Sequence, residues 1–100
     1  MVSLYPTPKV VHAERWLTVP SALRKVDVVP QWSYANRGGQ AIECFLEGPV
    51  FDDTGYLWLT DIPYGRIFRV TPDGVWEIMV EYDGWPNGLA VHPDRRIYIA

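Results

Sequence analysis

The sequence predicts an all-β protein and, more narrowly, part of a β-propeller. Glycine and proline make up 8 and 9 of the 100 residues and aromatic side chains 14%, a composition typical of short strands joined by tight turns. From residue 45 onward, short apolar runs alternate with turn signals. These runs repeat with the spacing that is typical of successive four-stranded propeller blades.

Residues 1–43 are expected to form an N-terminal arm. Residues 10–17 are interpreted as one strand, which could close the ring as the outer strand of the last blade. Residues 21–25 are interpreted as a helical turn with Ser21 as its N-cap. Residues 27–40 show neither a helical nor a strand period, so we expect an extended excursion there.

Residues 44–84 are predicted to form the first blade as an antiparallel meander. Each apolar run is about 4–8 residues long and ends at a cluster of Gly, Pro or Asp, which is typical of strands in a meander. The four expected strands are 48–51, 56–61, 66–70 and 75–82, and the turns between them are 52–55, 62–65 and 71–74.

An internal repeat predicts that residues 85–100 begin a second blade. When residues 47–52 are placed over 87–92, the same shift places residues 56–60 over 96–100. Trp58 then falls on Tyr98, and turn falls on turn. A helical repeat would instead show the period of a helix, which is absent from the sequence.

A propeller ring needs roughly 4–8 blades, whereas this sequence accounts for one blade and half of the next. A repeat unit that cannot bury its faces against neighbours is not stable alone. We therefore expect the 100 residues to be the N-terminal portion of a longer chain. The rest of the ring, or another chain, would cover the exposed faces of the blade.

Charge and composition exclude several classes of protein. Nine basic and 12 acidic residues give a net charge of −3 without a basic cluster, which argues against a nucleic-acid partner. No apolar run reaches the ~18 residues of a membrane span, and the N-terminus lacks signal-peptide features. Cys44 is the single cysteine, so neither an internal disulfide nor a thiolate zinc cluster is possible. We expect an acidic, cytoplasmic protein.

Several motifs together resemble a known enzyme family. Residues 46–52, 61–70 and 72–74 resemble the first blade of the SMP-30/gluconolactonase/luciferin-regenerating family, and residues 82–90 resemble the entry to its second blade. The resemblance covers roughly residues 44–100. It implies a six-bladed propeller with one divalent metal ion, usually calcium, in the central channel. It also implies hydrolysis of sugar lactones and related cyclic esters, so the expected partner is a small-molecule lactone.

Glu47 matches the first-blade metal ligand of that family. It precedes the innermost strand, where a carboxylate can reach the channel axis. A hard cation takes about 6–8 oxygen ligands, so other blades would have to supply the rest. The resemblance places those ligands and the acid–base residue beyond residue 100. The alternative is that Glu47 is an ordinary carboxylate at a strand edge.

Three further residues are candidates for the substrate pocket or for support of the metal ligand. Asn87 occupies the position of Glu47 one blade later, and could line the pocket, touch the metal through water, or simply begin a strand. Tyr64 and Trp85 lie in predicted loops, where a place on the pocket rim is plausible. By contrast, His12 and His92 have no recognisable partner motif, and residues 52–55 lack the closing glutamate of a calcium loop.

Two alternatives to the lactonase remain open. One is a propeller of the same shape that binds or scaffolds without a metal site. The other is a relative of the strictosidine-synthase-like propellers, which share the Gly-Pro element of the first blade but carry out different chemistry. Two Asn and one Asp facing the channel from later blades would favour the lactonase.

Overall fold

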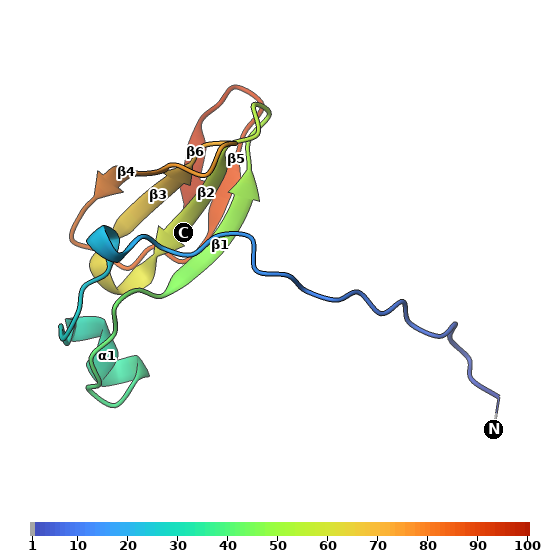
Figure 1. Cartoon of the computed structure of the whole chain (residues 1–100), viewed down its shortest axis with the longest axis horizontal. Coiled ribbons are helices and arrows are strands. Elements are labelled where there is room, and N and C mark those ends of the chain that lie inside the picture. Colours follow the sequence, from blue (N-terminus) through green and yellow to red (C-terminus); the bar gives the residue numbers. More distant parts are fainter. Residues whose placement is uncertain (1) are drawn as a thin grey trace.

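The computed structural model of the chain describes residues 2–100 and consists mainly of antiparallel strands (Figure 1). Four strands form one sheet in the order β1-β2-β3-β4, and two more form a separate hairpin. The prediction of an all-β chain with a four-stranded antiparallel meander is confirmed. The elements are η1 (Ser21–Leu23), α1 (Gln31–Asn36), β1 (Leu46–Phe51), β2 (Leu57–Asp61), η2 (Ile62–Tyr64), β3 (Arg66–Val70), β4 (Trp76–Glu81), β5 (Leu89–Val91) and β6 (Ile97–Ile99).

The first strand begins earlier than the sequence suggested and contains an irregularity. β1 starts at Leu46, and its register against β2 shifts between Glu47 and Val50. Gly48 lies within that shift with a φ of 60°, a conformation that favours glycine. Glycine inside a strand commonly marks such a bulge, which is why the predicted strand began only at that glycine.

The same turn closes three hairpins. In the first, Asp52 donates its N–H to the carbonyl of Tyr56 over 2.9 Å, and Gly55 donates to the carbonyl of Asp52 over 3.2 Å. The turns at 71–75 and 92–96 repeat both hydrogen bonds. The fourth residue of each turn has a positive φ, and it is glycine in the first two turns and Arg95 in the third.

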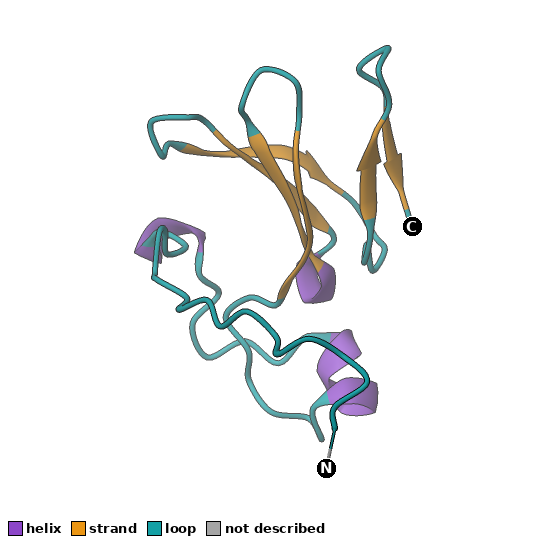
Figure 2. Ribbon diagram, turned by 90° about the vertical axis from the view of Figure 1, so that its right-hand side faces the viewer, coloured by secondary structure: helices purple, strands orange, loops and turns teal. Residues whose placement is uncertain are grey.

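The internal repeat of the sequence corresponds to one hairpin built twice. In the first hairpin Phe51 pairs with Leu57 and Val50 with Trp58. In the second, the equivalent residues of the next repeat form the same pairs, Val91 with Ile97 and Ala90 with Tyr98. Figure 2 shows this second hairpin standing beside one face of the four-stranded sheet, while the arm lies on the other side.

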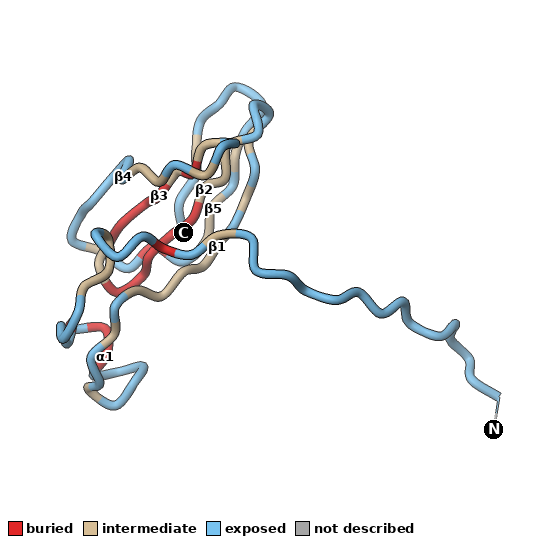
Figure 3. Tube along the Cα trace, viewed as in Figure 1, coloured by how far each residue is buried: buried red, intermediate tan, exposed pale blue. Residues whose placement is uncertain are grey.

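The core lies between the sheet and the arm. Leu59, Phe68 and Val70 are buried on one face of the sheet, where Figure 3 shows much of the buried chain. Leu17 and Leu23 of the arm pack against them, together with partly buried residues of the sheet. The arm therefore covers one face of the four-stranded sheet.

The arm differs from its prediction in three places. Residues 10–17 form no strand within residues 2–100 and are largely exposed, and their role as a ring-closing strand of the last blade stays a prediction. Ser21 is not a cap, since Pro20 occupies the N-cap position and no side chain bonds there. α1 lies within the segment 27–40 that was expected to be extended.

No helix in the described part of the chain is both long and apolar enough to cross a membrane. Cytoplasmic localisation stays a prediction.

Candidate functional site

The four candidate residues lie at one end of the sheet. β1 and β3 begin there, and β2 and β4 end there, because neighbouring strands are antiparallel. Glu47 is the second residue of β1 and Tyr64 closes η2. Trp85 and Asn87 lie in the crossover from β4 to β5, which returns the chain to the same end (Figure 1). We refer to this as the β1 end.

Glu47 and Asn87 are brought close through one buried side chain. Glu47 pairs with Thr60 in the register of β1 and β2. The hydroxyl of Thr60, which is fully buried, donates to the backbone carbonyl of Asn87 over 3.0 Å. A Cβ at Gly48 would lie only 2.8 Å from that same carbonyl oxygen, so the starts of the two hairpins rest directly against each other.

The backbone of Asn87 is held in place although the residue is exposed. Its N–H donates to the carbonyl of Ala100 over 2.6 Å, and Gly88 and Ala100 exchange two further backbone hydrogen bonds. Gly88 is therefore the partner of Ala100 in the second hairpin, whereas the register shift of β1 gives Thr60 Glu47 as its partner in the first. Asn87 lies one residue before this pair, at the start of the second hairpin.

The carboxylate of Glu47 is uncommitted within residues 2–100: no hydrogen bond or ion pair of that part of the chain engages it. Carboxylate and amide oxygens are the ligands that a hard divalent cation prefers, so Glu47 and Asn87 fit such an ion. Within the described residues, however, no three His, Cys, Asp or Glu side chains gather to hold a metal. The two residues would supply only part of a coordination shell.

Tyr64 and Trp85 differ in how far they are committed. The hydroxyl of Tyr64 donates to the carbonyl of Ile42, which ties η2 to the arm. Burial and the nearby carboxylate of Asp61 raise the pKa of Tyr64, so it stays a donor at neutral pH. Trp85 is 53% exposed and follows the crossover glycine, Gly84, where it is accessible from solvent.

A buried ion pair at the β1 end was missed from the sequence. Arg66 donates from Nε to Oδ2 of Asp61 over 2.8 Å, and its Nη2 lies 2.6 Å from the same oxygen without the alignment of a hydrogen bond. Oδ1 of Asp61 accepts the N–H of Phe45, and Nη1 of Arg66 donates to the carbonyl of Leu23. The first and last residues of the Asp-Ile-Pro-Tyr-Gly-Arg motif therefore hold the arm in place through these hydrogen bonds. Opposite charges flanking a tight turn were the available signal.

Two cations of the arm were also missed. The guanidinium of Arg37 lies over the ring of Phe45, 5.0 Å from its centroid, and the amine of Lys25 lies 5.8 Å from the centroid of Tyr64. In the sequence, Arg37 lies within the excursion expected over residues 27–40 and has no predicted role. Its role depends on α1, whose six residues are too few to show a helical period.

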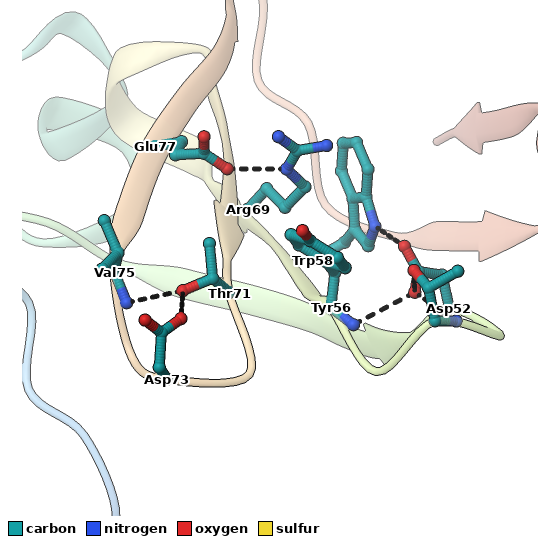
Figure 4. A network of polar contacts seen from close by, with 9 residues as sticks. Asp52, Tyr56, Trp58, Arg69, Thr71, Asp73, Val75 and Glu77 are labelled. Carbon is teal, nitrogen blue, oxygen red and sulfur yellow. Dashed lines mark hydrogen bonds and ion pairs between the residues drawn. The ribbon is translucent and has the colours of Figure 1, made fainter.

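The opposite end of the sheet carries a polar network whose charged side chains are engaged in hydrogen bonds or in an ion pair (Figure 4). Burial raises the pKa of Asp52, but hydrogen bonds from Trp58, Thr54 and Tyr56 outweigh it and lower that pKa to about 2. Arg69 pairs with Glu77 at 2.7 Å. A cavity of about 290 Å³ lies between this network and the second hairpin, away from Glu47. Because its charged groups already have partners, we do not regard it as the functional site.

Comparison with known proteins points to lactonases. No family model and no solved structure matches the chain. The chain is 30% identical over 81 residues to "Lactonase drp35" of Staphylococcus aureus strain bovine RF122 / ET3-1, and 31% identical over 81 residues to the protein of that name from strain MRSA252. Each match covers 79% of this chain but 24% of the relative, so the chain spans about a quarter of the length of these relatives. The chain is therefore distantly similar to part of a lactonase.

Proposed function

We propose that the complete protein is a metal-dependent lactone hydrolase built as a six-bladed propeller, with Glu47 as one ligand of a divalent cation, calcium by preference. One observation carries the proposal: two equivalent oxygen-bearing residues, Glu47 and Asn87, begin successive hairpins at the same end. The similarity to a lactonase over 79% of the chain supports the choice of substrate class.

The residues of this chain would have distinct roles. Glu47 would hold the cation, and Asn87 would line the pocket or contact the cation through water. The hydrogen bond from Thr60 to the carbonyl of Asn87 keeps the two positions in register. When bound, the cation polarises the lactone carbonyl and stabilises the charge that develops as water attacks. Further blades would supply the remaining ligands and the acid–base residue.

Replacing Glu47 in the complete protein tests the proposal. We expect Glu47→Ala to abolish tight calcium binding in titration calorimetry and to lower lactonase activity by about 100-fold, because a metal ligand is lost. The matched control is Glu43→Gln, whose exposed carboxylate lies 3.7 Å from Arg24 and should leave both unchanged. Calcium binding without hydrolysis in the wild type would instead indicate a binding propeller. Unaltered hydrolysis in Glu47→Ala would remove Glu47 from the mechanism.

A further inference from the structure

Within residues 2–100, Arg15 and Arg37 are the arginines without an acidic partner. The guanidinium of Arg37 lies over the ring of Phe45. Stacking on an aromatic face leaves the edge of a guanidinium, with its N–H donors, free for a ligand. The arginines that do pair are Arg24 with Glu43, Arg66 with Asp61, Arg69 with Glu77, Arg95 with Asp53 and Arg96 with Asp94.

The position of Phe45 places Arg37 near the candidate metal ligand. The carbonyl of Phe45 accepts the N–H of Ile62 over 3.1 Å, which extends the β1–β2 ladder by one residue before Leu46. Alternate residues of a strand share a face, so Phe45 and Glu47 point to the same side of the chain. Two residues of strand span roughly 7 Å, which is the separation expected between the backbones of Phe45 and Glu47.

Arg37 is held on a fixed element of the arm. Trp32 of α1 is buried and packs on Phe45 with ring centroids 5.1 Å apart. The N–H of Arg37 donates to the carbonyl of Ser33 over 2.7 Å, and Asn36 donates its side chain to the carbonyl of Trp32. Figure 1 shows α1 beside the β1 end. The guanidinium of Arg37 is thus carried by a helix that is packed against Phe45.

A second cation of the arm lies at the same end. The amine of Lys25 lies over Tyr64 and likewise has no acidic partner in the described chain. The backbone N–H of Lys25 donates to the carbonyl of Glu43 over 3.1 Å, which fixes this part of the arm. The β1 end therefore carries two cationic side chains that make no ion pair within residues 2–100, together with the uncommitted carboxylate of Glu47.

We propose that Arg37, supported by Lys25, binds an anionic group of the substrate, so that the site prefers lactones carrying a carboxylate or a phosphate outside the lactone ring. A guanidinium matches both groups with two parallel hydrogen bonds. This inference rests on the proposed function, because it places the lactone at Glu47. It assigns substrate selection to the arm and not to the blade.

Kinetics with matched lactones tests the inference in the complete protein. The probes are a neutral aldonolactone, the corresponding lactone with a terminal carboxylate, and the corresponding lactone with a terminal phosphate. We expect Arg37→Gln to raise KM about tenfold for whichever charged lactone the wild type prefers, with kcat and the neutral lactone unaffected. Lys25→Gln should raise the same KM less, and Arg96→Gln, at the opposite end, should change nothing. Equal effects on charged and neutral lactones, or none, would overturn the inference.

A binding measurement separates this inference from the proposed function. Calorimetry with the open-chain hydroxy acids that carry the second carboxylate or the phosphate needs no turnover. Binding to the wild type that weakens about tenfold in Arg37→Gln supports the inference even if no lactone is hydrolysed, in which case the proposed function alone fails. Binding that is absent, or equal in both proteins, overturns the inference. Arg37 is exposed, so the variant should unfold at the wild-type temperature.

Discussion

Gly48 is the residue at which the two hairpins approach most closely. Its φ of 60° favours glycine, and an added Cβ would meet the carbonyl oxygen of Asn87 at 2.8 Å. We expect Gly48→Ala to lower the free energy of unfolding by about 3 kcal/mol, because backbone strain and overpacking add together. Gly38→Ala is the control, since Gly38 has a φ of 63° but nothing within 4 Å of its Cβ position. That variant should lose about 1 kcal/mol in denaturant unfolding. Equal losses would show that the close approach contributes nothing.

Asp52 makes the stability of the first hairpin depend on pH. Its pKa is about 2 in the folded chain and 3.8 in the absence of the fold, so the carboxylate stabilises the folded state above pH 4. This contribution is lost as the pH falls from about 4 to about 2. We expect Asp52→Asn to unfold at a lower temperature than the wild type at pH 7, and the gap to close near pH 2. Asp53→Asn, in an exposed neighbour, should show no such gap. A gap that stays constant down to pH 2 would contradict the assigned cause.

At the scale of elements, the arm is held to the four-stranded sheet by a buried charge pair. Asp61 and Arg66 are 0% and 2% exposed, and Arg66 also donates to the arm at Leu23. We expect Arg66→Leu to lower the free energy of unfolding by about 3 kcal/mol, because it leaves the charge of Asp61 buried without a partner. Hydrogen exchange at the Lys25 amide should also accelerate, since the arm loses its anchor.

Two comparisons sharpen that prediction. Arg69→Leu removes a more exposed pair with Glu77 and should cost much less than Arg66→Leu. The double variant Asp61→Asn with Arg66→Leu should recover part of the loss, because no unpaired charge remains. If Arg66→Leu and Arg69→Leu cost the same, the buried pair is not the anchor.

The strands were predictable, whereas the arm was not. Each strand of the sheet is bounded by a turn signal a few residues away, so local patterns are sufficient to locate it. α1 spans six residues, and its burial depends on Trp32 meeting Phe45, a contact that no local pattern reveals. The expected strand at 10–17 depended on a partner edge that sequence periodicity cannot supply.

The candidate site likewise has residues that could be predicted from the sequence and residues that could not. The repeat placed Glu47 and Asn87 in equivalent positions, and the structure puts both at the β1 end. The anchor of Arg66 lies far away along the chain, at Leu23, so spacing could not identify it. A role for Arg37 could be inferred only from its position over the ring of Phe45. Local patterns predict hairpins, but they do not predict what a separate segment brings to them.

In the whole chain described, the four-stranded sheet lies between two different neighbours. The arm covers one face of the sheet, and the second hairpin stands at the other (Figure 2). Large side chains at the outer strand and second hairpin remain exposed, among them Met79, Val80 and Tyr98. Apolar surface of this kind is suited to burial against another repeat unit, as a propeller requires. The proposed ring follows from that requirement and from the repeat.

The three matching turns have an evolutionary consequence. A stretch of gene that encodes one repeat, from the first hairpin onward, carries its strand register and its closing turn with it. Duplicating that stretch adds a repeat unit that already packs against its neighbour, so no new turn between its strands has to evolve. The two copies in this chain carry different residues at one equivalent position, glutamate at residue 47 and asparagine at residue 87. The number of repeat units and the residues at the β1 end can therefore change independently of each other.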